Sequence, residues 1–179
     1  MALERLYAAW RESYVSSPDA ARHSRDEGTC VFCVLSAEEP SAQSGVLWRN
    51  EYAFITLNAF PYGSGHLLVL PRRHVGGVSD LEEAEYDSFA RTLRLAVRAL
   101  ESAYGADGMN IGMNLGQAAG AGIPKHLHAH ALPRWSGDTN FMTAIGETRV
   151  LPESLETTWS KVVSYLGTPS GPYAGRLGD

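Results

Sequence analysis

The chain has 179 residues, 44% of them hydrophobic and 20% charged, and its 15 basic and 20 acidic side chains give a net charge of −5. These proportions are typical of a globular domain with a core, and they exclude disorder over most of the length. The acidic balance argues against unspecific nucleic-acid binding, which depends on a basic surface. Apolar stretches such as Leu67-Leu68-Val69-Leu70 are far shorter than the roughly 20 residues of a transmembrane helix, and the charged N-terminus lacks a signal-peptide core. We therefore expect a cytoplasmic protein that binds neither membranes nor nucleic acid.

The first half of the chain predicts a helix, a loop and then strands. Apolar residues at helical spacing predict an amphipathic helix over residues 3–14, and a polar, loop-like segment follows. Three β-prone runs come next, at 46–48, 52–57 and 67–70, separated by turn-forming residues. This order favours hairpin-connected strands.

The longest helix is predicted over residues 81–104, which keep one face apolar. Ser79 with Glu82 has the spacing of a capping box, and Gly105 is placed to end the helix. Two more strands are predicted at 109–115 and 126–132, with a glycine-rich loop between them.

A last helix is predicted around residues 155–166, before a tail rich in glycine, proline and serine. Strands, one long helix and further strands indicate an α+β fold with an antiparallel sheet, one long helix and extra N- and C-terminal helices.

Three of the six histidines alternate along one predicted strand, at His126, His128 and His130. In a strand, side chains two positions apart share a face, so the three imidazoles face one way and the apolar residues between them face a core. A half-buried strand with polar residues facing water would not require imidazoles. The histidine face could instead bind a catalytic metal, or one histidine could be a nucleophile flanked by donors to an anion. Spacing alone leaves both open.

The run from His126 to Leu132 resembles the His-φ-His-φ-His-φ-φ signature of the histidine triad (HIT) superfamily of nucleotide hydrolases and transferases. Residues 65–71 are similar to its G-H-φ-φ-V-φ-P segment, with Asn58 at the place expected before it. Residues 110–116 resemble the strand that precedes the signature. Residues 133–155 resemble a narrower branch that contains bacterial diadenosine tetraphosphate phosphorylases. The resemblance implies a HIT domain over 28–140.

The resemblance also implies a division of catalytic labour. His128 would be the nucleophile that attacks the α-phosphorus and forms a nucleotidyl-histidine, which a second acceptor then removes. His130 and Asn114 would donate to phosphate oxygens, His66 would orient the histidine cluster, and Asn58 would bind the ribose hydroxyls. Asn114 as a strand-end turn residue and His66 as a satisfied core histidine are the alternatives.

Further nucleotide-binding residues that the resemblance implies are Phe32, Leu35, Leu57, Gly120, Gly122 and Trp135. The first three would form an apolar base pocket or belong to the core. The glycines would let backbone N–H groups approach phosphate. Trp135 would stack on a base or pack internally. The loop is neither a Walker motif nor a dinucleotide fingerprint.

The end of the glycine-rich loop departs from the family pattern. Many members carry Gln, Ser or Thr there, whereas this chain has Ala121, Gly122 and Ile123. The missing donor leaves assistance to the leaving group in doubt and makes the phosphate pocket roomier. A roomier pocket would admit orthophosphate as the acceptor, as a phosphorylase requires, and it equally fits weak activity.

Two cysteines, Cys30 and Cys33, have the spacing of a zinc knuckle, with two free buried thiols as the alternative. The resemblance implies that His74 and His126 complete a Cys₂His₂ zinc site. Four protein ligands make a closed, structural site. Mg²⁺ would enter only with the substrate.

Around the HIT domain we expect an N-terminal helical extension over 1–27, a C-terminal extension with a helix over 141–166 and a mobile tail over 167–179. The resemblance implies a homodimer through the long helix and a strand, which the terminal helices could extend to a tetramer. Four activities stay open: phosphorolysis of dinucleoside polyphosphates to ADP and ATP, hydrolysis of these or of nucleoside phosphoramidates, nucleotide binding with little turnover, and a metalloenzyme that uses the three histidines directly.

Overall fold

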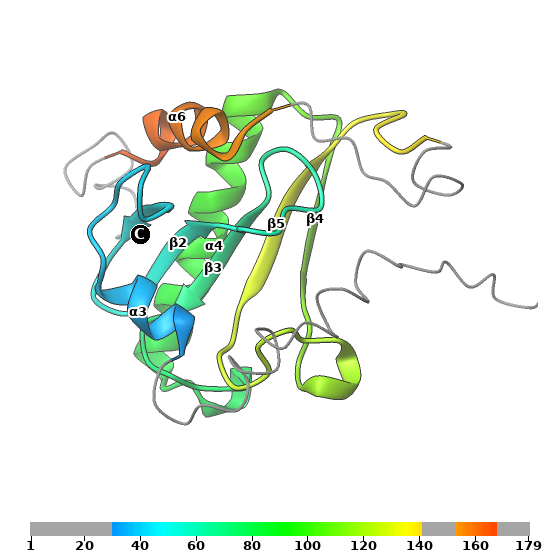
Figure 1. Ribbon diagram of the computed structural model, residues 1–179. Helices are drawn as coiled ribbons and strands as arrows, with labels where there is room; N and C mark the ends of the chain where they lie inside the picture. Colours follow the sequence, from blue (N-terminus) through cyan, green and yellow to red (C-terminus); the bar gives the residue numbers. More distant parts are fainter. Residues whose placement is uncertain (1–29, 141–152, 168–179) are drawn as a thin grey trace, which may run out of the picture.

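The computed structural model describes residues 30–140 and 153–167 (Figure 1). The predicted helix at 3–14, the loop that follows it, the segment 141–152 and the tail beyond 167 lie outside the described residues. No helix in the described ranges combines the length and the apolar character needed to cross a bilayer.

One five-stranded sheet organises the described chain, in the order β1-β2-β3-β5-β4 with every neighbouring pair antiparallel. Its strands are β1 (Val46–Arg49), β2 (Ala53–Leu57), β3 (Leu67–Pro71), β4 (Gly108–Met113) and β5 (Ala129–Arg134). Strands β2 and β3 are buried at every residue, which explains why all of their residues except Thr56 are apolar. In β5, buried and partly buried residues alternate. The predicted α+β class with an antiparallel sheet is confirmed.

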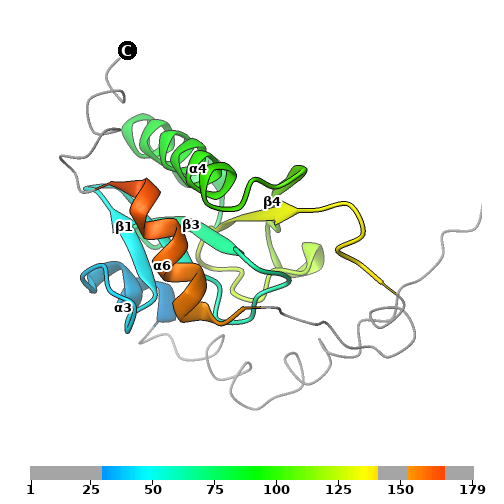
Figure 2. The ribbon, with the colours of Figure 1, turned by 90° about the horizontal axis from the view of Figure 1, so that it is seen from above.

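The two faces of the sheet carry different covers. The long helix α4 (Glu83–Tyr104) lies on one side, and the short helix α3 (Val31–Ala37) lies on the other (Figure 2). The helix α6 (Leu155–Leu166) packs against α4 and β1. The larger core cluster lies between the sheet, α4 and α6, and a smaller cluster lies under α3. The site therefore has to be sought on the face that α4 leaves open.

The start of α4 differs from the prediction. Ser79 belongs to a short 3₁₀ turn (Val78–Asp80), and the capping box is formed by Glu82 and Glu85. The Glu85 carboxylate accepts from the Glu82 backbone N–H at 2.9 Å, so the helix begins later than its apolar pattern suggests. The predicted end is confirmed, because Gly105 adopts the left-handed conformation at φ 53°.

Strand β5 also starts later than predicted, at Ala129 rather than at His126. Its pairing with β3 ends at Val69 and Ala129, because the residues before that point have other partners. The Leu127 backbone N–H donates to Val75 at 2.6 Å. Helix α3 and the short 3₁₀ turn η2 (Gln117–Ala119) were not predicted.

Candidate active site

We call β5 together with the residues that lead into it from His126 the triad strand. It separates apolar from polar side chains as the alternation predicts. Leu127, Ala129 and Ala131 are at most 2% exposed and belong to the core cluster under α4. The imidazoles of His128 and His130 lie on the opposite face, with ring centroids 5.2 Å apart. The strand therefore offers its histidines to the open face of the sheet.

The middle histidine, His128, is buried and has one nitrogen committed to the backbone. Its Nδ1 lies 2.8 Å from the His126 carbonyl oxygen, which can only accept, so Nδ1 carries the proton. Burial lowers the pKa of His128 against a smaller opposing effect of this hydrogen bond, so the ring is neutral at pH 7. The lone pair of a neutral ring in this tautomer resides on Nε2.

Two successive hydrogen bonds determine which ring nitrogen of the outer histidine, His130, carries the proton. The Tyr62 backbone N–H donates to His66 Nδ1 at 3.0 Å, so this nitrogen is unprotonated. In the neutral ring His66 Nε2 then carries the proton and donates to His130 Nδ1 at 2.9 Å. The proton of a neutral His130 consequently lies on Nε2, which makes that nitrogen a donor suited to an anion.

The two predicted asparagines occupy different places. Asn58 is buried, its Oδ1 accepts from the Phe60 backbone N–H at 3.0 Å, and its Nδ2 lies 3.3 Å from His66 Nδ1. Asn114 follows β4 one position beyond the pair formed by Met113 and Ala129. Continued by one residue, that register places Asn114 level with His128, just beyond the ends of the two paired strands.

The glycine-rich loop follows directly on β4. Gly116 and Gly120 flank the turn η2 with φ values of 79° and 86°, which only glycine adopts without strain. Gly122 is exposed. Trp135 follows β5, and its ring lies edge-on to that of Tyr104 at a centroid distance of 5.8 Å.

The apolar candidates for a base pocket divide between the two faces. Phe32 packs its ring 5.5 Å from that of His126 and 5.3 Å from that of His128, and Leu35 packs in the same cluster under α3. Leu57 belongs to the core cluster under α4. The structure thus brings Phe32 and Leu35 together with the histidine face, and it places Leu57 among core residues.

The four predicted metal ligands meet at one place although they lie far apart in the sequence. One ligand atom from each of Cys30, Cys33, His74 and His126 lies within 4.8 Å of the others. Cys33 Sγ is 3.2 Å from His74 Nδ1, and Cys30 Sγ is 3.4 Å from His126 Nδ1. This cluster could hold a metal ion.

The donor chemistry of this cluster fits zinc. His126 Nε2 lies 2.9 Å from the Pro71 carbonyl oxygen and donates to it, which leaves Nδ1 as a lone-pair donor toward the cysteines. Burial lowers the pKa of His126 to about 4, so its ring is neutral, as a ligand must be. Burial and the neighbouring Cys30 raise the pKa of Cys33 to about 11. A thiol in such surroundings becomes a thiolate when a cation compensates the charge.

Ion pairs that the sequence reasoning did not single out hold both ends of the site. Arg73 donates from Nε and Nη2 to the Glu85 carboxylate at 2.6 and 2.5 Å, directly beside His74. Arg134 makes the same forked contact with Asp138 at 2.5 and 2.7 Å, directly beside Trp135. In the sequence, these pairs are indicated only by an arginine that directly precedes a candidate site residue, His74 or Trp135.

Comparison with known proteins shows the family of the chain. The family model described as HIT domain matches residues 39–137. A Mycobacterium tuberculosis protein named AP-4-A phosphorylase is 33% identical over 157 residues, which cover 87% of this chain and 80% of that protein. A Saccharomyces cerevisiae protein named bis(5'-adenosyl)-triphosphatase is 35% identical over 91 residues, 50% of this chain and 44% of that protein.

A solved structure resembles the fold as well. The crystal structure of a Zn-bound histidine triad family protein from Mycobacterium smegmatis superposes with a TM-score of 0.61 at 26% identity, covering 77% of this chain and 93% of that one. The residues that the HIT domain model matches include all five strands of the sheet and α4. The chain therefore belongs to the HIT family.

Proposed function

We propose that this protein cleaves dinucleoside polyphosphates of the diadenosine tetraphosphate type, with His128 as the nucleophile. The observation that carries the proposal is the 2.8 Å contact between His128 Nδ1 and the His126 carbonyl oxygen. This contact fixes the tautomer in which Nε2 has the lone pair, and burial keeps the ring neutral. A neutral imidazole with a fixed lone pair on Nε2 suits attack on phosphorus.

In the first step, a bond forms between His128 Nε2 and the α-phosphorus, and the bond from that phosphorus to the bridging oxygen breaks. The departing polyphosphate keeps the electron pair, and the nucleotidyl group stays on the histidine. The protonated Nε2 of His130 donates to a phosphate oxygen, and Asn114 donates from the neighbouring strand end. The Gly120 backbone N–H already donates to the Gln117 carbonyl oxygen at 2.9 Å, so backbone N–H groups near Gly122 would be the further donors.

In the second step, we propose that an orthophosphate oxygen attacks the same phosphorus and the bond to His128 Nε2 breaks. Diadenosine tetraphosphate would then yield ADP and ATP. The loop end formed by Ala121, Gly122 and Ile123 supports this acceptor, because it lacks a hydroxyl or amide side chain that would donate into the phosphate pocket. The name of the M. tuberculosis relative supports the same acceptor.

Recognition of the nucleoside rests on residues around the histidine face. Phe32 and Leu35 would contact the base, Asn58 would bind the ribose, and Trp135 would stack on a base. Leu57 is a weaker candidate than these, because it packs under α4. Mg²⁺ would accompany the polyphosphate.

We also propose that Cys30, Cys33, His74 and His126 hold a structural zinc ion. When bound, zinc supplies a cross-link between the segment that opens α3 and the triad strand, together with the charge that keeps both cysteines as thiolates. The hydrogen bond to the Pro71 carbonyl oxygen orients His126 within this cluster. Reduced cysteines fit a cytoplasmic location.

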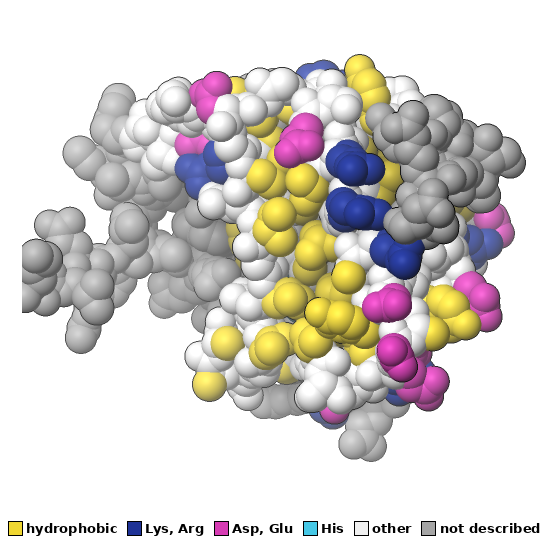
Figure 3. All heavy atoms as spheres, turned by 180° about the vertical axis from the view of Figure 1, so that it is seen from behind, with side chains coloured by type: hydrophobic (Ala, Val, Ile, Leu, Met, Phe, Trp, Pro, Cys, Tyr) yellow, Lys and Arg dark blue, Asp and Glu magenta, His cyan; other side chains and the backbone are white. Residues whose placement is uncertain are grey.

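A homodimer is part of the proposal. Within residues 30–140 and 153–167, strand β4 pairs only with β5 and ends the sheet, and its Ile111 and Met113 are 51% and 40% exposed. The face seen from behind carries a broad group of hydrophobic side chains beside a row of basic ones (Figure 3). An uncovered strand edge with apolar side chains favours pairing with a second copy. Sedimentation velocity at micromolar concentration tests this, and a monomer would contradict it, whereas a tetramer would extend it.

The experiment that tests the function is product analysis with diadenosine tetraphosphate, with and without orthophosphate, resolved by anion exchange. ADP and ATP that form only with orthophosphate would support the proposal in full. AMP and ATP without orthophosphate would establish hydrolysis and overturn the choice of acceptor. Tight nucleotide binding without product would overturn the enzymatic proposal and indicate a binding protein.

A further inference from the structure

Tyr104, the last residue of α4, lies between three parts of the molecule that are remote in the sequence. Its ring lies edge-on to Trp135, which follows the triad strand. The same ring lies against Gly65, the residue before His66. Its hydroxyl donates to the carboxylate of Glu153, just before α6.

The contact with Gly65 is tight enough to fix the backbone there. A Cβ placed on Gly65 would lie 2.8 Å from Tyr104 Cε2 and 2.7 Å from Pro133 Cγ, both closer than real Cβ atoms approach other atoms. Gly65 also has a φ of 75°, which disfavours any side chain. The chain before His66 is therefore held between the Tyr104 ring and strand β5. His66 in turn donates to His130 at 2.9 Å.

Glu153 anchors Tyr104 from the other side. Its side chain is 10% exposed and accepts from the Tyr104 hydroxyl, from Lys161 Nζ and from Thr158 Oγ1, the last at 2.8 Å. Lys161 Nζ also lies 5.2 Å from the centroid of the Tyr104 ring. Burial, followed by the hydrogen bond to Glu153, raises the pKa of Tyr104, so its hydroxyl remains protonated and a donor at neutral pH.

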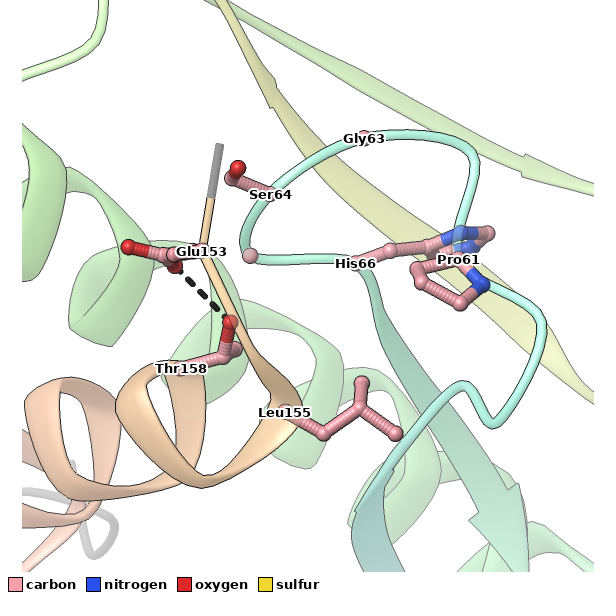
Figure 4. Close-up of a pocket in the computed structure, with 8 residues that line it drawn as sticks. Pro61, Gly63, Ser64, His66, Glu153, Leu155 and Thr158 are labelled. Carbon is pink, nitrogen blue, oxygen red and sulfur yellow. Dashed lines mark hydrogen bonds between the residues drawn. The ribbon is translucent and has the colours of Figure 1, made fainter. Parts of the chain in front are cut away.

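The turn before His66 faces the same carboxylate. A small pocket between this turn and α6 is lined by Ser64 and His66 on one side and by Glu153 and Thr158 on the other (Figure 4). Ser64 Oγ is buried there without a hydrogen-bond partner among the described residues. The C-terminal helix thus reaches the loop that carries His66 both directly and through Tyr104.

We infer that Tyr104 is a positioning residue, anchored by Glu153, that fixes His66 and Trp135 relative to His128. The inference rests on the proposed function, since His66 and Trp135 matter as parts of that site. It assigns to α6, outside the matched HIT domain region, a part in holding the catalytic geometry. Loss of the ring frees the backbone at Gly65 and removes the edge contact of Trp135, whereas loss of the hydroxyl removes only the anchor.

Three variants and one control separate positioning from simple destabilisation. Tyr104→Leu removes the ring, Tyr104→Phe removes only the hydroxyl, and Glu153→Gln keeps an acceptor oxygen. Val162→Ala is the control, because Val162 is a fully buried residue of α6 whose truncation destabilises the core cluster without removing the ring or the hydroxyl of Tyr104. We expect kcat to fall about 10- to 100-fold in Tyr104→Leu, since small misplacements of reacting groups cost this much. We expect a loss of a few fold in Tyr104→Phe and less than twofold in Glu153→Gln and Val162→Ala.

A second readout does not depend on turnover. Long-range ¹H–¹⁵N spectra of the imidazoles report the tautomer and surroundings of each histidine. We expect Tyr104→Leu to shift the signals of His66 and His130 and to leave those of His74 in place. Unchanged His66 and His130 signals in Tyr104→Leu, or a loss of kcat in Val162→Ala equal to that in Tyr104→Leu, would overturn the inference. If the wild-type protein turns over no dinucleotide, the proposed function fails, and the spectra still decide whether Tyr104 positions the histidines.

Discussion

The two outer histidines of the triad are held by different kinds of partner. We call the part of the site that carries the proposed zinc ligands the metal end, and the part around His130 and His66 the phosphate end. At the metal end, His126 is fully buried and donates to the backbone carbonyl of Pro71. At the phosphate end, His130 is partly buried and its tautomer follows from the side chain of His66. Main-chain partners persist when side chains change, so the orientation of His126 is robust to substitution of its neighbours. Orientation at the phosphate end depends on side chains and is the more easily altered by substitution.

The largest effect is expected at His128, the histidine between the two ends. His128→Ala removes the nucleophile, and we expect kcat for diadenosine tetraphosphate to fall by more than about 10⁴-fold, as for other enzymes that lose their nucleophile. The nucleotide dissociation constant should change little, because the base and ribose contacts remain. Steady-state kinetics and calorimetric binding of ADP check both parts. Near-normal turnover in this variant would show that another group is the nucleophile.

The next largest effect tests the side-chain relay at the phosphate end. His66→Ala removes the donor to His130 Nδ1, which frees His130 to adopt either tautomer, and we expect a loss of about 10²-fold in kcat, within the range for general acid–base groups.

His66→Gln is the matched variant, because its amide N–H can still donate to His130. We expect it to retain several times the activity of His66→Ala at a similar thermal stability. Equal activities of the two variants, measured together with Tm, would remove the relay from the mechanism.

At the metal end we expect a large effect on stability and a smaller one on activity. The double substitution Cys30→Ser with Cys33→Ser should lower bound zinc below about 0.3 per chain, because a structural zinc site binds through its thiolates. At free zinc 100 times its dissociation constant, linkage contributes about 2.7 kcal/mol to the free energy of unfolding. For a chain of this size, that loss lowers Tm by about 5–10 °C.

Metal analysis and calorimetry check this prediction, with the wild-type protein after chelation as the control. We expect the chelated wild type to reach the same lowered Tm and to keep more than a tenth of its kcat, since His128 keeps its backbone partner. Complete loss of activity on chelation, restored by zinc, would favour a catalytic metal and contradict a structural one.

The difference between the ends also explains how far the sequence could predict the molecule. The apolar runs of β2 and β3 need no partner to be recognised, and the alternating histidines predict the strand that forms as β5 from Ala129 onward. The place where β5 begins depends instead on contacts made across the fold. His126 lies outside the paired part of the strand and contacts the Pro71 carbonyl and Cys30, and no local sequence pattern predicts these contacts.

Helix ends and short helices were likewise decided by remote partners. The sequence predicts a capping box in which Ser79 is the cap and Glu82 its partner, but the Arg73 fork holds Glu85 at the position where it closes the box on Glu82. Helix α3 has only seven residues and its first cap, Cys30, makes no side-chain cap hydrogen bond. Its helical form follows from packing in the cluster under the sheet, which a local pattern cannot show.

The smallest expected effect compares the two arginine forks, one at each end of the site. Arg73 binds Glu85 and also the Asp80 carbonyl at 2.7 Å, and so holds the segment that carries the exposed ligand His74. Lysine keeps the charge but cannot make the forked contact. We expect Arg73→Lys to weaken zinc binding by up to about 10-fold, at the low end of the effects known for groups that orient metal ligands.

Arg134→Lys is the matched control, since Arg134 makes an equal fork with Asp138 but lies beside Trp135 at the phosphate end. Its zinc affinity, measured by competition with a chromophoric chelator, should equal that of the wild type, while its KM for the dinucleotide should rise modestly. Both variants replace arginine by lysine and lose a forked contact with a carboxylate. That shared change cannot by itself lower zinc affinity in one variant and raise KM in the other. Equal zinc affinities in the two variants would mean that His74 is held by its own loop and by the ion alone, and that the metal end needs no side-chain support at all.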